Sequence, residues 1–345
     1  HGDPATYAGV RQLGDYFDRR ELEQKAAFGE VSWEFIPRWT LTGGARAYDY
    51  ERTGRVDTTA SVFFGPTART TIIDADASGS TFRGNLSFKP NDQATLYAGW
   101  SQGFRLGSPQ PGLPSTCDLN NDGVLDGSGI SLASTRSTQS DEVDNYELGA
   151  KFSLLDGRLS LAADVYRMDW TGVPIRVNVG VCGSYTANAG AARSQGVELQ
   201  ANFQVTPSLR IDLGGSRINA ELTKDAPGLF VPAFDGDRLP GSPELNANLS
   251  VQYEFNVFEH AAFVRLDSIY VGDFYGDLQE SANNQAGDYL KADATARLAI
   301  EKFTIDVFVR NLTNQDDYTF RHLGLPNHGY RLRPRTVGVQ LSYEF

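Results

Sequence analysis

The 345-residue chain has no uninterrupted apolar segment long enough to form a membrane-spanning helix, although 40% of its residues are hydrophobic. A helix needs roughly 20 consecutive apolar residues to cross a bilayer, so this absence excludes a helical membrane protein. It leaves a membrane barrel open, because barrel strands alternate apolar and polar residues and give a much weaker hydropathy signal.

Positive charge is scarce as well. The chain carries 31 Lys and Arg residues against 43 Asp and Glu residues, which gives a formal net charge of −12. Proteins that bind nucleic acid do so through clustered basic residues. We therefore expect no nucleic-acid partner.

The sequence also lacks the common signatures of enzymes. Its four histidines form no H-E-x-x-H zinc motif, and it contains neither the phosphate-binding loop G-x-x-x-x-G-K-[ST] nor a dinucleotide fingerprint after a strand. We therefore predict that the chain is not an enzyme.

What the chain does contain is strict alternation of apolar and polar residues. At the C-terminus, Val337, Val339, Leu341, Tyr343 and Phe345 alternate with polar or small residues. The same period of two recurs in residues 82–89, 146–154, 197–205, 209–213, 245–257, 292–300 and 303–309. Because successive side chains of a strand point to opposite faces, this pattern predicts an all-β chain.

The lengths of strands and connections narrow the fold class. Several runs exceed the strands of soluble sheets and suit membrane strands, which need roughly 9–11 tilted residues. Short turns near residues 36–38, 90–92, 156–157, 206–208, 258–260 and 301–302 alternate with long polar loops near residues 52–80, 103–140, 172–192, 219–241, 272–287 and 314–333. This order is typical of antiparallel transmembrane β-barrels of the outer-membrane type. Counting strands between these landmarks predicts about 13 strands, or about 14 if residues 6–17 form one more.

Several motifs, in a fixed order, resemble the C-terminal barrel portion of the TonB-dependent outer-membrane receptors. They are L-Y-A-G-W-S-Q-G-F-R at 96–105, Y-E-L-G-A-K at 146–151, S-Q-G-V-E-L at 194–199, L-P-G-S-P-E at 239–244, V-R-N-L-T-N at 309–314 and R-T-V-G at 335–338. The resemblance extends from about residue 24 to residue 345.

The resemblance implies a receptor in the outer membrane of a Gram-negative bacterium that captures a scarce nutrient and imports it with energy supplied by the TonB complex. In this family a barrel of about 22 strands encloses a plug domain. Neither the plug nor the energy-coupling segment is recognisable here, so we expect residues 1–345 to be the C-terminal part of such a barrel without the plug and the first strands. We accordingly expect an incomplete barrel, seen as an open, curved sheet.

The resemblance also implies the partners of the chain. These are outer-membrane lipid, the barrel-assembly machinery, a nutrient ligand and, for the full-length protein only, the TonB complex. A ferric siderophore or similar iron complex is the leading ligand, with haem, cobalamin and an oligosaccharide as alternatives. A passive outer-membrane diffusion channel is the alternative function.

The loop near residues 103–140 contains an aspartate-rich segment. Asp118, Asn120, Asp122 and Asp126 place side-chain oxygens at intervals around Gly123, an arrangement that can wrap one hard cation such as Ca²⁺. The bidentate glutamate of an EF-type loop is missing, because its position is occupied by Gly129. A weak or structural calcium site and a solvated loop that binds no ion are both open interpretations. No other cofactor is expected.

The two cysteines, Cys117 and Cys182, lie in outer loops that are neighbours along the predicted barrel. Disulfides persist in the oxidising compartment through which outer-membrane proteins pass. We favour a bridge between the two loops over two free thiols.

Strand parity also identifies charged residues of the polar face. If the apolar face contacts lipid, seven charged residues point into the lumen: Arg210, Asp212, Arg265, Asp267, Arg297, Asp306 and Arg310. They would line the transport path or contact the plug. The alternative role is cross-strand ion pairing that stiffens the sheet.

Overall fold

The computed structural model describes residues 16–59, 68–108, 110, 112–188, 190–226, 232–321 and 328–345. Their dominant feature is one antiparallel sheet of 13 strands in the order β1-β2-β3-β4-β5-β6-β9-β10-β11-β12-β15-β16-β19. The prediction of an all-β chain is therefore confirmed. None of the helices in this part of the chain is long and apolar enough to cross a membrane.

The strands of the large sheet have the following bounds: β1 Tyr16–Ile36, β2 Trp39–Thr58, β3 Arg69–Asn91, β4 Ala94–Arg105, β5 Asp141–Leu154, β6 Leu159–Thr171, β9 Ala191–Thr206, β10 Leu209–Leu222, β11 Leu245–Val257, β12 His260–Val271, β15 Tyr289–Ile300, β16 Phe303–Arg310 and β19 Thr336–Tyr343. Short strands pair within the loops: β7 Pro174–Asn178 with β8 Ser184–Asn188, β13 Phe274–Tyr275 with β14 Gln285–Ala286, and β17 Tyr318–Arg321 with β18 Gly329–Arg331. Four short 3₁₀ helices complete the set: η1 Ser115–Cys117, η2 Ser134–Arg136, η3 Gly180–Cys182 and η4 Ala282–Asn284.

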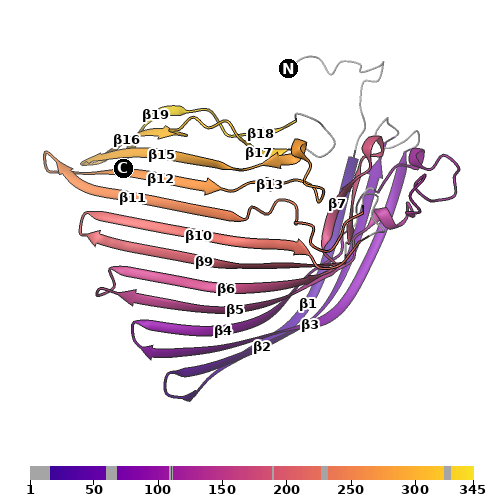
Figure 1. Cartoon of the computed structure of the whole chain (residues 1–345), viewed down its shortest axis with the longest axis horizontal. Coiled ribbons are helices and arrows are strands. Elements are labelled where there is room, and N and C mark those ends of the chain that lie inside the picture. Colours follow the sequence, from indigo (N-terminus) through magenta and orange to yellow (C-terminus); the bar gives the residue numbers. More distant parts are fainter. Residues whose placement is uncertain are drawn as a thin grey trace.

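Short turns and long connections gather at opposite ends of this sheet. Figure 1 shows the tight hairpin turns at one end and all the long connections at the other. Residues with positive φ make the tight reversals at Arg38, Phe258 and Glu301. The alternation of turns and loops predicted from the sequence is therefore present in the fold.

The strands β1 to β3 are much longer than the sequence indicated. A loop was predicted near residues 52–80, but β2 continues to Thr58 and β3 begins at Arg69. The alternation is hidden there because polar side chains occupy both faces. Burial explains the extension, since Tyr50 and Val56 are 3% and 1% exposed. These strands project beyond the rest of the sheet, at the end where the long connections lie (Figure 1).

The sheet is strongly curved but open. Within the described residues, β1 pairs only with β2 and β19 pairs only with β16, so the two outer strands do not meet. This confirms the predicted incomplete barrel, and the count of 13 strands matches the prediction. Most of the additional strand predicted over residues 6–17 lies outside the described residues.

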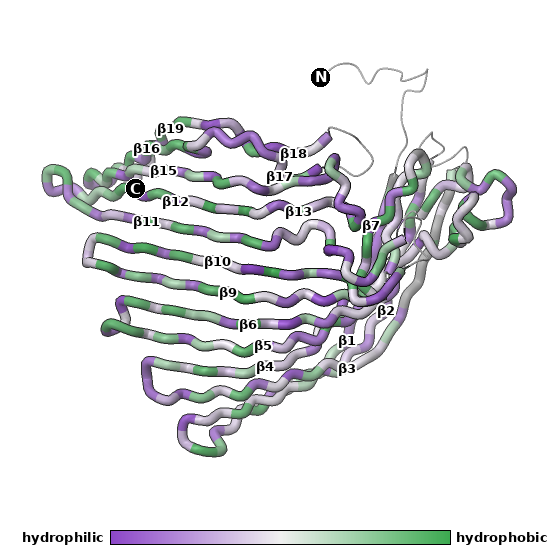
Figure 2. The backbone as a smooth tube through the Cα atoms, viewed as in Figure 1, coloured by the Kyte–Doolittle hydropathy of each residue, from purple (hydrophilic) through white to green (hydrophobic). Residues whose placement is uncertain are grey.

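One face of the sheet is apolar over its whole width. The register aligns Val339 with Val307, Val307 with Ala296 and Ala296 with Val264, so apolar side chains form continuous rows across neighbouring strands. Many of these side chains are uncovered: Val339 is 69% and Leu148 60% exposed. Figure 2 shows the resulting alternation of hydrophobic and hydrophilic residues along the strands. A surface of this kind matches a hydrocarbon environment.

A charge placed on the apolar face should prevent stable insertion. We predict that Leu213→Arg lowers the free energy of unfolding by up to about 4 kcal/mol, because a cationic side chain near the bilayer midplane costs about 2–4 kcal/mol. Urea titration of the protein in lipid vesicles, followed by heat-modifiable gel mobility, measures this change.

Asn202→Arg is the matched control, because Asn202 lies on the polar face directly opposite Asp212. Its added guanidinium gains an acidic neighbour and should change stability little. Equal losses in the two variants would contradict the assignment of the faces.

Candidate functional site

The long connections pack together over one end of the sheet around an apolar cluster, the loop core. Its members are buried and come from four connections and two strands: Leu113, Cys117, Leu125, Leu132, Val173, Ile175, Val177, Val179, Tyr185, Ala192, Leu222, Ala233 and Leu278. Leu222 and Ala233 are completely buried and Leu113 is 1% exposed. Burying such side chains stabilises by about 1.5–3 kcal/mol each, so these loops form an ordered assembly.

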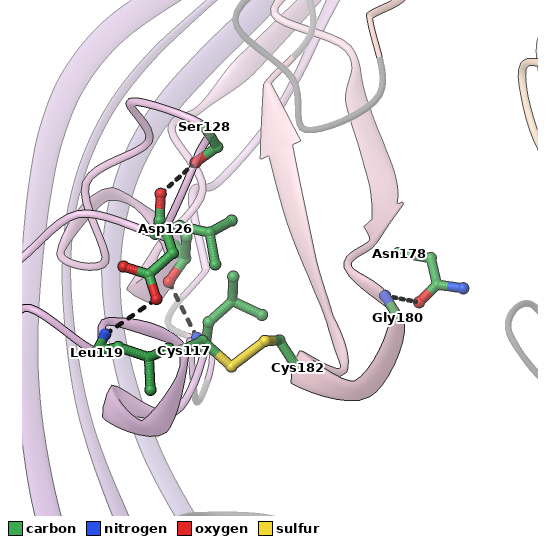
Figure 3. The surroundings of a disulfide bond; sticks show 10 residues. Cys117, Leu119, Asp126, Ser128, Asn178, Gly180 and Cys182 are labelled. Atoms are coloured by element: carbon green, nitrogen blue, oxygen red, sulfur yellow. Dashed lines mark hydrogen bonds between the residues drawn. A yellow bond between two sulfur atoms is a disulfide. The ribbon is translucent and has the colours of Figure 1, made fainter.

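A disulfide joins two of these connections. The sulfur atoms of Cys117 and Cys182 are 2.08 Å apart and the two Cα atoms 6.0 Å apart, across 65 residues of sequence. The bond links η1 of the β4–β5 connection to η3, which lies in the turn between β7 and β8, and Asp126 lies beside it (Figure 3). The bridge favoured from the sequence is thus the arrangement found in the structure.

Polar contacts join the strand ends next to the loop core and tie the β4–β5 connection to β2. The guanidinium of Arg105 forms a forked ion pair with Asp141, with Nη2 to Oδ2 at 2.6 Å, and Asp141 is only 5% exposed. The same guanidinium lies 4.6 Å from the ring centre of Trp170. On the long strands, the Tyr50 hydroxyl bonds Ser140 and the Arg52 guanidinium donates to the Gly107 carbonyl. The β4–β5 connection is therefore held to β2 by two hydrogen bonds, while Arg105, Asp141 and Trp170 hold the ends of β4, β5 and β6 together.

The aspartate-rich segment lies beside the disulfide and is organised by its own hydrogen bonds. The Asp118 carboxylate accepts the amides of Asp122 and Gly123, and Asp126 accepts the amide of Leu119 (Figure 3 shows the latter). The Asn120 amide donates to Asp122. Within the described ranges, no three His, Cys, Asp or Glu side chains gather so as to hold a metal ion. These oxygens thus serve backbone amides, and calcium binding by this loop stays a prediction.

The seven charged residues predicted for the lumen share the polar face of the sheet, opposite the apolar rows. Six of them pair with one another. Arg297 and Asp306 are cross-strand neighbours joined by two hydrogen bonds of 2.6 and 2.8 Å. Arg210 pairs with Asp212, and Arg265 with Asp267, two residues along the same strand. The cross-strand pairing considered from the sequence is therefore present at Arg297 and Asp306 only, the other two pairs lie within single strands, and a role toward the lumen stays a prediction.

The seventh residue, Arg310, has a partner that sequence reasoning missed. Asp293 lies 3.6 Å from Arg310 and 2.9 Å from Lys291, and it also accepts the backbone amide of Asn311. Strand parity assigns Asp293 to the same face, so the alternation over residues 292–300 could have identified it. The pairs Arg105–Asp141 and Glu30–Arg83 were missed for another reason, because they join strands whose register the sequence does not reveal.

A cationic cluster lies in the β16–β19 connection. The guanidiniums of Arg321 and Arg331 lie 4.0 and 4.2 Å from the ring centre of Tyr318. Arg331 also donates to the Tyr318 hydroxyl, and this hydrogen bond lowers the pKa of Tyr318 below its usual range. The hairpin is tied to the rest of the loops because Gly287 donates to the Tyr318 carbonyl. Arg331 also forms an ion pair with Asp316 at 3.0 Å, so its charge is partly offset, and this connection brings two guanidiniums together on one ring within an acidic chain.

Comparison with known families identifies the class of protein. The family described as "TonB dependent receptor-like, beta-barrel" matches residues 1–312. The chain therefore belongs to the TonB-dependent receptor β-barrel family, as the motifs indicated.

Curated relatives are named as receptors for a siderophore, for pesticin and for metal-pseudopaline. The chain is 25% identical to the "Probable TonB-dependent siderophore receptor PiuA" of Acinetobacter baumannii, over 83% of this chain and 36% of that protein. It is 25% identical to the "Pesticin receptor" of Yersinia pestis, over 94% and 44% respectively. It is 33% identical to the "Metal-pseudopaline receptor CntO" of Pseudomonas aeruginosa, over 52% and 24%. The chain spans less than half the length of each of these relatives.

Solved structures agree on the fold. The ferric yersiniabactin uptake receptor FyuA from Yersinia pestis superposes with a TM-score of 0.77 at 20% identity, covering 96% of this chain and 47% of that chain. The ferric citrate transporter FecA superposes with a TM-score of 0.68 at 18% identity, covering 96% and 46%. The large sheet thus has the curvature and strand order of part of such a barrel.

Removing the disulfide should loosen the loop core without unfolding the sheet. We predict that Cys117→Ser with Cys182→Ser makes the peptide bond after Arg136, the one trypsin site in residues 112–140, much more sensitive to trypsin, because a bridge closing 65 residues restrains the unfolded segment by about 4 kcal/mol. Mass spectrometry of the fragments locates the cuts. Ser134→Ala, an exposed change in the same connection, serves as the control. Unchanged protection in the double variant would show that the apolar contacts alone hold the loops.

The ion pairs of the polar face should differ in strength according to burial. We predict that Asp306→Asn lowers the free energy of unfolding by about 1.5–3 kcal/mol, since it removes the charge from two short hydrogen bonds to Arg297. Asp212→Asn should cost at most about 1 kcal/mol, because its pair is more exposed. The Asp306 side chain is 10% exposed and the Asp212 side chain 25%. Urea titrations of both variants test this order, and equal shifts would contradict it.

Proposed function

We propose that the chain is part of a receptor in the outer membrane of a Gram-negative bacterium that takes up a metal complex, most simply a ferric siderophore. The observation that carries the proposal is the two-faced sheet with its loop assembly at one end. Family membership and the receptors named among the relatives support it.

The apolar face supports the location. Its rows contain no charged side chain over the central part of strands such as β11, where Leu249, Val251 and Tyr253 follow one another on that face. The opposite face carries ion pairs and amides that require water or protein neighbours. Lipid outside and a wet lumen inside satisfy both faces, with the short turns toward the periplasm and the long connections toward the medium.

The loop assembly supports ligand capture. Four connections form an ordered surface at the outer end, and the β16–β19 connection adds the cationic cluster of Tyr318, Arg321 and Arg331. Guanidinium groups bind carboxylate and other anionic oxygen groups through forked hydrogen bonds. We therefore propose that this cationic cluster binds an anionic chelate that arrives from the medium. Release inward would require the TonB complex, acting on the complete receptor.

Passive diffusion is the weaker alternative. The relatives carry names of receptors for siderophores and metal complexes. The loop assembly also covers the outer end of the sheet, where a diffusion channel needs an open mouth.

Uptake of radiolabelled iron tests the proposed function. The native gene should restore uptake of at least one ferric siderophore, from a panel of catecholate, hydroxamate and carboxylate types, to a receptor-deficient strain. Uptake should stop when tonB is deleted. Replacing Arg321 and Arg331 by Ala should lower it by about tenfold or more, because each hydrogen bond to a charged group contributes about 1.5–3 kcal/mol.

Arg158→Ala, at a turn of the opposite end, provides the matched control. Uptake that persists without TonB, or size-limited swelling of liposomes containing the protein, would contradict the receptor and favour the passive channel.

A further inference from the structure

The apolar face of the sheet is not uniformly convex, because small residues form a groove across it. Ala150, Ala163, Gly215 and Ala247 lie in one cross-strand row from β5 to β11, interrupted only by Leu199. Larger side chains border them, and the result is a shallow, open groove of ≈ 810 Å³. This volume falls within the roughly 300–1,000 Å³ of ligand sites.

Three charged residues line this groove, but strand parity directs the side chains of Asp164 and Glu198 to the opposite face of the sheet, so only Arg217 of the three belongs to the apolar face. Arg217 pairs in register with Val197 on one side and Leu245 on the other, so it belongs to the apolar face. The row continues through Val165 and Leu148, which are apolar as well. Arg217 is exposed, and among the described residues no acidic group lies within ion-pair distance of it. An unpaired guanidinium on a lipid-facing surface is costly unless a polar group reaches it.

A polar hollow adjoins the groove on the side of the long connections. It has a volume of ≈ 570 Å³ and shares Val165, Val197 and Arg217 with the groove. Gln195, Asn219 and Glu244 contribute its polar groups. The Glu244 carboxylate lies 4.0 Å from Arg238, so its charge is partly offset there. Arg217 thus lies at the border between the apolar groove and the polar hollow.

We propose that this two-part cavity binds one phosphorylated lipid of the outer leaflet. Its acyl chains lie in the groove over Ala150, Ala163 and Gly215, and its phosphate accepts hydrogen bonds from Arg217. The side-chain amide of Gln195 bonds the remaining polar atoms of the headgroup, whereas the Asn219 amide already donates to Glu221. This site rests on the membrane location proposed above, but it is independent of the nutrient that the receptor carries.

The geometry distinguishes this site from general contact with lipid. Arg167, the nearest arginine on the same face toward the loops, is already held by two hydrogen bonds to Asp169. Arg193 donates to the same carboxylate. Among the described arginines of this part of the face, Arg217 combines a charge that has no acidic partner with a groove beside it. The proposed lipid is therefore bound by Arg217 and by the groove, and not by a ring of basic residues around the sheet.

Lipid retention by the protein produced from its native gene tests the proposal. The protein is placed in phosphatidylcholine nanodiscs doped with bisphosphorylated lipid A, transferred to detergent and examined by native mass spectrometry. We expect one retained lipid A molecule per protein and no comparable retention of phosphatidylcholine. Arg217→Ala should reduce lipid A retention by roughly fivefold, since one basic residue contributes about 1 kcal/mol to the binding of anionic lipid. Ala163→Phe, which fills the groove with an apolar ring, should reduce it as well.

Two control variants define the contrary result. Ala201→Phe adds the same ring to the apolar face outside the groove, and Arg158→Ala removes a positive charge at the other end of the sheet. Retention that falls equally in all four variants, or lipid A that exchanges as readily as phosphatidylcholine, would overturn the proposal. Siderophore uptake is measured on the same variants. A loss of lipid retention with intact uptake supports the lipid site, whereas unchanged retention with intact uptake refutes it and leaves the proposed receptor untouched.

Discussion

The backbone hydrogen bonds between neighbouring strands are the constraint on which this structure depends. A bilayer offers no water to satisfy amide and carbonyl groups, so every membrane-spanning strand must pair on both sides. Thirteen strands satisfy one another in this way, and the pairing forces their side chains to alternate between two environments. Apolar rows on one face and ion pairs on the other follow from that single requirement. At the outer edges of β1 and β19, backbone amide and carbonyl groups pair with no further strand among the described residues.

The long connections are stabilised by different interactions from those of the sheet. Beyond the sheet, the connections are surrounded by water and hold together as soluble proteins do, through a buried apolar cluster and a disulfide. The long strands β1 to β3 belong to both the sheet and the assembly of long connections. Their inner ends take part in the two-faced sheet, while Tyr50 and Val56 farther along β2 are buried. The β4–β5 connection is thereby held against the extended part of β2.

The sequence revealed the fold class because alternation is a local property. Residues 245–257 specify both faces of β11 without reference to any other strand, and turn residues such as Phe258 and Glu259 mark its end. It revealed the ends of β2 and β3 poorly, since both faces of these strands are polar there and the period of two disappears. The site shows the same division. Cys117 and Cys182 were recognisable as residues of neighbouring loops, but the partnership of Arg105 with Asp141 depends on a register that only the folded chain displays. Arg217 escaped notice because Gly214 and Gly215 interrupt the alternation just before it.

The central claim is that the two faces of this sheet lie in lipid and in water. Spin labels attached at successive positions of β11, from Leu249 to Gln252, test it most directly when the protein is reconstituted in vesicles. The account predicts that Leu249 and Val251 are accessible to molecular oxygen and shielded from a water-soluble nickel complex, and that Ser250 and Gln252 show the reverse. Equal accessibility to the nickel complex at all four positions would contradict it.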